Sequence, residues 1–85
     1  MAADERTLLD AIAGIEAAGG VAHSQAVAQS SGLRTDEIDR IAKALIDRGY
    51  LSRAYADRAD QRAETLGPRY LVTVAGRRQL DSPPT

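Results

Sequence analysis

The stretch AVAQSSGLRTDEIDRIAKALIDRGYL, residues 26–51, contains two helical patterns separated by only about three residues. The second pattern starts after Thr35, its expected N-cap, and its apolar positions recur at steps of three and four. Gly32 and Gly49 follow the two patterns, and glycine readily adopts the left-handed conformation that ends a helix. The stretch therefore predicts two helices joined by a tight turn. The residues expected to face the core from the second helix are Ile38, Ile41, Ala42 and Leu45.

The opposite side of this second helix carries charges of both signs. Its outward residues are Asp36, Asp39, Arg40, Lys43 and Asp47. One interpretation is a solvated surface, because Asp36–Arg40 and Asp39–Lys43 have the favourable spacing and order for ion pairs worth about 0.2–0.5 kcal/mol each. The other interpretation is a binding surface, and it depends on the elements around the helix.

An amphipathic helix is expected ahead of this stretch, over residues 4–18, with Asp4 as its cap. Two glycines, residues 19–20, end it. Ser24 is the expected N-cap of the short helix that precedes Gly32. The apolar residues of the first helix are Leu8, Ile12 and Ile15.

Two β-strands are expected after the stretch, over residues 50–55 and 68–74, joined by a charged segment. Thr73 is expected to cap a last short helix, and residues 81–85 are expected to form a disordered tail. The residues expected on one face of the second strand are Tyr70, Val72 and Val74.

The composition fits one small domain. The 85 residues contain no cysteine, which excludes disulfides and thiolate metal sites and fits a reducing cytoplasm. No segment reaches the ~18 apolar residues of a membrane span. The net charge is −1, but residues 1–33 carry −3 and residues 48–80 carry +4. The positive charge is therefore concentrated around the expected hairpin, where arginine suits contact with phosphate.

Three helices followed by a hairpin, with a short turn before the third helix, form a helix-turn-helix with a wing. We expect a mainly α winged helix-turn-helix, with a three-helix core and a two- or three-stranded hairpin sheet, in a single domain over residues 1–80. From about Val21 to Leu80 the chain resembles winged helix-turn-helix transcription regulators, especially the MarR-like and PadR-like types. The motifs that carry the resemblance are residues 26–51 and YLVTVAGRRQL, residues 70–80, with Val72, Thr73, Gly76, Arg77 and Leu80 at the matching positions.

The resemblance implies binding of double-stranded DNA, usually by dimers. The motif DQR, residues 60–62, resembles the Asp-x-Arg wing motif of the MarR-like group, which would bring Arg62 to the minor groove. The segment between Arg62 and Thr73 is longer than that pattern, so Arg58 and Arg69 are alternatives. The additional terminal helices that dimerise MarR-like proteins are missing, so we expect no small-molecule pocket. A homodimer would use the first helix, at Ala11, Ala13, Ala17 and Ala18.

The resulting hypothesis is a transcriptional regulator whose third helix lies in the major groove and whose wing follows the backbone or minor groove. Acids do not exclude this, because aspartate accepts a hydrogen bond from the amino group of cytosine. The acidic helix face and the net charge favour an alternative, a winged helix that docks on a protein partner; a mimic that titrates a regulator is a third possibility. The expected DNA contacts are Ser24, Gln25, Arg34, Thr35, Asp39, Arg40, Lys43, Arg58 and Arg62.

The remaining candidates predict no enzyme. His23 is the single histidine and has no cysteine partner, so neither a metal nor a cofactor is expected. Tyr50 and Tyr70 alternate toward the hairpin core, so we expect them to pack rather than to stack on bases as in single-strand binders. No nucleophile with a positioned base and no pair of carboxylates suited to acid–base chemistry is visible.

Overall fold

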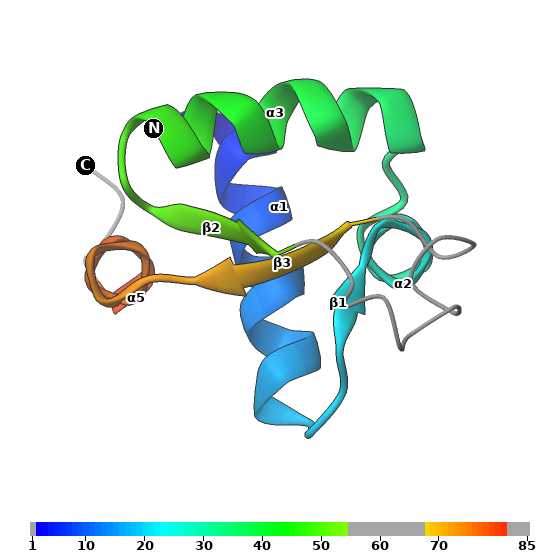
Figure 1. The fold of residues 1–85 in the computed structure, drawn as a ribbon, viewed down its shortest axis with the longest axis horizontal. Coiled ribbons are helices and arrows are strands. Elements are labelled where there is room, and N and C mark those ends of the chain that lie inside the picture. Colours follow the sequence, from blue (N-terminus) through cyan, green and yellow to red (C-terminus); the bar gives the residue numbers. More distant parts are fainter. Residues whose placement is uncertain (1, 55–67, 82–85) are drawn as a thin grey trace.

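The computed structural model describes residues 2–54 and 68–81, and within them it contains four helices and one three-stranded sheet (Figure 1). In chain order the elements are α1 (Ala3–Ala17), β1 (Ala22–His23), α2 (Ser24–Ser31), α3 (Thr35–Asp47), β2 (Leu51–Ala54), β3 (Arg69–Val72) and α5 (Val74–Asp81). Three residues separate α2 from α3, as the sequence predicts. The mainly α winged-helix fold is therefore confirmed.

The sheet is antiparallel, and β3 is its central strand, between β1 and β2. Tyr70 of β3 lies opposite Ala22 on one side and Arg53 on the other. The pattern left two or three strands open, and the third strand is the two-residue β1. Figure 1 shows α3 along one side of the molecule, α1 crossing behind the sheet, and α2 and α5 at opposite ends.

One cluster of buried side chains joins the helices to the sheet. Leu8, Leu9 and Ile12 enter it from α1, and the four predicted core residues of α3 are all buried. The sheet contributes Leu51 and Tyr70, and Tyr70 is completely buried. Among the described residues, no helix is long and apolar enough to cross a membrane.

The glycines end the helices as predicted, but the expected N-caps are wrong. Gly32 and Gly49 have φ angles of 78° and 81°, the left-handed conformation that glycine adopts without a steric penalty. Ser24 and Thr35 are instead the first helical residues, and neither α2 nor α3 has a side-chain hydrogen bond at its cap position. Similarly α1 starts at Ala3, so Asp4 lies inside its first turn. The cap positions differ from the prediction by one residue in α2 and α3 and by two in α1, a usual difference for helix ends.

The segment after β3 differs from the prediction in two respects. Thr73 caps α5 as expected, because its Oγ1 accepts from the Gly76 amide at 3.0 Å and donates to the Gly49 carbonyl at 2.7 Å. Val74 begins this helix and is exposed, so its expected place on the strand face is wrong. The helix also includes Asp81, the first residue of the predicted tail, whereas residues 82–85 lie outside the described part.

We predict that Gly76→Ala lowers the free energy of unfolding by about 1–3 kcal/mol, a typical cost of overpacking. A Cβ atom at this position would overlap the carbonyl oxygen of Tyr50, which is backbone and cannot rotate away. Gly14→Ala is the matched control, because nothing lies near its added Cβ and the change should stabilise α1 by about 0.5–1 kcal/mol. Urea denaturation followed by circular dichroism measures both variants. Equal stability of Gly76→Ala and the parent would contradict the close approach.

Candidate nucleic-acid interface

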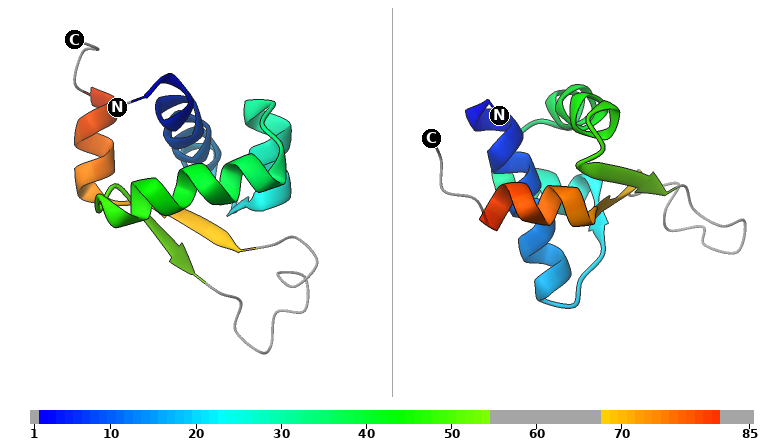
Figure 2. Two further views of the ribbon diagram at one scale, coloured as in Figure 1. Left: turned by 90° about the horizontal axis from the view of Figure 1, so that it is seen from above. Right: turned by 90° about the vertical axis from the view of Figure 1, so that its left-hand side faces the viewer.

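The outward face of α3 is exposed along its whole length. All five residues predicted to point outward, from Asp36 to Asp47, are exposed, and the opposite stripe is buried. Figure 2 shows β2 and β3 leaving the helical part of the molecule together, beside this helix. The arrangement leaves one face of α3 available for a partner next to the hairpin.

The first acid on this face is paired with an arginine that precedes the helix. Arg34 donates to both carboxylate oxygens of Asp36, from Nε at 3.1 Å and from Nη2 at 2.5 Å, and lies 3.5 Å from Glu37. This hydrogen bond lowers the pKa of Asp36 below its ordinary value. The expected Asp36–Arg40 pair is therefore wrong. The Arg34 side chain is 74% exposed, so no neighbouring group among the described residues prevents it from leaving Asp36 for another partner.

The second acid on this face, Asp39, accepts a hydrogen bond from a residue of the sheet. The hydroxyl of Tyr70 donates to Oδ1 of Asp39 at 2.8 Å, across 31 residues of sequence. The expected Asp39–Lys43 ion pair does not form. Burial of the phenol and the hydrogen bond to Asp39 raise the pKa of Tyr70 above its ordinary value of 10.0, while Ser24 and Arg53 act in the opposite direction.

The arginine opposite Tyr70 in the neighbouring strand, Arg53, packs against the tyrosine ring. Because Arg53 and Tyr70 are directly opposite in neighbouring strands, their side chains point to the same side of the sheet. The guanidinium carbon of Arg53 lies 5.7 Å from the centre of the Tyr70 ring, within the range of a cation–π contact. Sequence alternation indicated a packed Tyr70, but neither its acceptor nor this arginine was predicted. Arg69, the residue before Tyr70, points to the other side of the sheet.

The two basic residues on the outward face of α3 make no ion pair or hydrogen bond within the described part of the chain. They are Arg40 and Lys43, one turn apart. The acids on the same face are engaged at Asp36 and Asp39. The side chains that are still able to bind an anion are therefore the basic ones.

The other predicted contacts are placed unevenly. Ser24 is only 6% exposed, so its hydroxyl lies inside the protein, which argues against the predicted contact with phosphate. Gln25 and Thr35 are exposed at the starts of α2 and α3. Arg58 and Arg62 lie outside the described residues, and their role stays a prediction.

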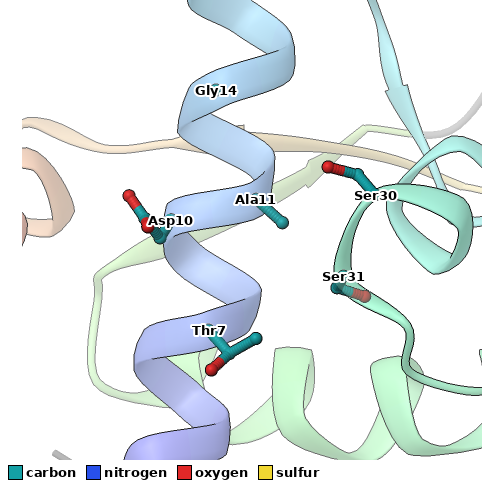
Figure 3. A pocket seen from close by; sticks show the side chains of 6 residues that line it. All are labelled: Thr7, Asp10, Ala11, Gly14, Ser30 and Ser31. Atoms are coloured by element: carbon teal, nitrogen blue, oxygen red, sulfur yellow. The ribbon is translucent and has the colours of Figure 1, made fainter.

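A hollow between α1 and α2 has a volume of about 340 Å³ and is open to solvent (Figure 3). It runs against the expectation of no small-molecule pocket, because two neighbouring helices of this short chain suffice to form it. Four of its lining residues come from α1 and two from α2: Thr7, Asp10, Ala11, Gly14, Ser30 and Ser31. Within the described residues, no group of three potential metal ligands occurs.

The alanines predicted as a dimer contact do not form one face. At about 100° per residue, Ala11 and Ala18 lie on one side of the axis of α1, and Ala13 and Ala17 lie on the opposite side. Ala11 also lines the hollow beside α2. A homodimer through α1 stays a prediction, with two smaller alanine pairs in place of the single surface.

We predict that Tyr70 makes the protein lose stability in alkali. The folded pKa is above that of the unfolded chain, so the stabilising contribution is complete below about pH 10 and is lost as the pH rises through the folded pKa. Tyr70→Phe should lower the free energy of unfolding by about 1–2 kcal/mol at neutral pH and flatten its decline above pH 10. Tyr50→Phe is the control, because it removes a hydroxyl from a tyrosine that is only partly buried beside the same core. Urea unfolding from pH 7 to 11 measures this, and identical slopes in both variants would contradict it.

Comparison with known proteins supports the fold. No protein-family model and no curated protein matches the chain. A solved structure of BpsR from Bordetella bronchiseptica, from work on the regulation of that protein's DNA binding by 6-hydroxynicotinic acid, matches 95% of this chain with a TM-score of 0.75 and 18% sequence identity. The match covers 51% of the BpsR chain, so this chain spans about half the length of its structural neighbour. This chain therefore has the fold of part of a DNA-binding protein.

Proposed function

We propose that the chain is a transcriptional regulator that binds double-stranded DNA in a sequence-specific manner, with α3 in the major groove and the wing along the backbone or minor groove. The observation that carries the proposal is the state of the charges on α3. Arg40 and Lys43 are exposed and unpaired among the described residues, whereas Asp36 and Asp39 already have partners. Phosphate attraction needs such available cations. The fold shared with part of BpsR adds support.

The proposed contacts fall into two groups. Residues at the starts of α2 and α3 and along α3 would contact phosphates and base edges, and the wing would add further phosphate contacts. The first group comprises Gln25, Arg34, Thr35, Asp39, Arg40 and Lys43. The second comprises Arg58 and Arg62, which the resemblance to MarR-like regulators assigns to the wing. We also propose that the chain is related to the MarR-like or PadR-like regulators.

A second candidate function is a winged helix that docks on a protein. The observation that favours it is the balance of charges at the start and along the exposed side of α3, where acids outnumber bases by four to three. The acids are Asp36, Glu37, Asp39 and Asp47, and the bases are Arg34, Arg40 and Lys43. Such a surface suits a basic protein partner better than a phosphate backbone.

We predict that the parent chain binds a fluorescent random-sequence duplex at low salt, and that log K falls steeply with log salt concentration. Each phosphate contact contributes about 0.9 to this slope, so replacing both Arg40 and Lys43 by glutamine should make it shallower by about two. Arg62→Ala should flatten it further if the wing is engaged. Fluorescence anisotropy measures the slopes.

Arg77→Gln is the matched control, because it removes one charge from α5, where the arginine pairs with Glu16. Its slope should equal that of the parent. Absence of binding by the parent even at low salt would overturn the DNA-binding proposal and favour the protein-docking candidate. An equal slope in the Arg40 and Lys43 double variant would instead move the DNA contact away from α3.

A further inference from the structure

Asp39 differs from the other acids of α3 in the state of its two oxygens. Both oxygens of Asp36 receive hydrogen bonds from Arg34, so that carboxylate has little capacity left. Asp39 accepts one hydrogen bond through Oδ1, from Tyr70, and no hydrogen bond to Oδ2 occurs among the described residues. An exposed carboxylate is thus fixed by one oxygen while the other still accepts.

The donor that orients Asp39 is itself buried in the core. Tyr70 is completely buried, lies in the central strand and is opposite both Ala22 and Arg53. The guanidinium of Arg53 covers its ring. A side chain whose orientation is set before binding loses less conformational entropy when it makes a specific hydrogen bond. The buried tyrosine therefore prepares a surface carboxylate for directional recognition.

The charge on this carboxylate is also moderated. The Tyr70 hydroxyl donates to it, and the positive Arg53 lies on the same side of the sheet. The hydrogen bond from Tyr70 offsets part of the repulsion that a carboxylate meets near phosphate. In the major groove the amino group of cytosine is the donor that aspartate recognises.

We propose that Asp39 is a specificity-determining residue that accepts a hydrogen bond from the exocyclic amino group of a cytosine, and that Tyr70 is its positioning residue. The inference rests on the proposed function, because it requires α3 to lie in the major groove. Arg40 and Lys43, on the same face, supply attraction that does not depend on sequence. Asp39 contributes selection between base pairs and little overall affinity.

The test begins with selection of duplexes from a random pool by the parent chain. Anisotropy then compares the selected duplex with single base-pair substitutions of it, for the parent, Asp39→Asn, Tyr70→Phe and the double variant. We expect Asp39→Asn to reduce the preference for one C·G pair on the order of tenfold, with the other positions unchanged. Tyr70→Phe should weaken the same preference by a smaller factor, and the double variant should resemble Asp39→Asn.

Two controls separate base recognition from charge and from packing. Asp47→Asn removes the same charge from the last turn of α3 and should change the affinity for every duplex by one common factor. Tyr50→Phe removes a hydroxyl from another tyrosine next to the sheet and should leave base preference unchanged. Asp39→Asn alters an exposed side chain, so it tests the proposal even if Tyr70→Phe does not fold.

The outcomes distinguish this inference from the proposed function. Binding at low salt with no selected motif, or a uniform effect of Asp39→Asn on all duplexes, overturns the role of Asp39 and leaves DNA binding intact. An effect of Tyr70→Phe at other base pairs overturns its positioning role. A flat anisotropy signal for every duplex at low salt overturns the proposed function, and the inference with it.

Discussion

The burial of one polar side chain, Tyr70, constrains both the sheet and the third helix. Tyr70 is the largest fully buried side chain of the described residues, and a buried hydroxyl without an acceptor costs more than a hydrogen bond gains. The acceptor is Asp39, which belongs to α3. Because β3 is bonded to both other strands, this contact, together with the shared core, fixes the position of the sheet relative to α3. The hairpin and the helix therefore behave as one surface.

Charged residues of α1 bind β3 and the last helix, α5. Glu16 accepts from the Val72 amide at 3.2 Å and pairs with Arg77 at 3.3 Å, which ties α1 to β3 and α5. Arg6 donates to the carbonyls of Gln79 and Leu80 at the end of α5. A chain without phenylalanine or tryptophan has few large apolar groups to locate a short terminal helix. Directional hydrogen bonds from a long, well-packed helix serve that purpose here.

The spacing of apolar residues and the positions of glycines in the sequence predicted the fold. They could not predict contacts between residues far apart in the chain. The period of Ile38, Ile41 and Leu45 predicted the buried face of α3, because a helix repeats its faces at fixed spacing. The two-residue β1 was missed because so short a strand leaves no alternation in the sequence. The predicted ion pairs along α3 were wrong because the acids bind other donors. These donors are Arg34 and Tyr70, which lie outside the helix. Sequence spacing on one helix cannot reveal such competitors.

The contacts of Asp36 and Asp39 also affect which charges of α3 are available to a partner. Aspartate carries its charge close to the helix backbone, where Asp36 and Asp39 meet donors of the protein itself. Arginine and lysine carry their charges on longer, flexible stems, so the charged groups of Arg40 and Lys43 are able to reach toward a partner. Charges separated by more than about 10 Å are largely screened at 0.1 M salt, so the groups nearest a partner dominate its attraction. A net charge of −1 therefore describes the whole chain and not the outward face of α3. On that face Arg40 and Lys43 have no partner among the described residues, whereas Asp36 and Asp39 do.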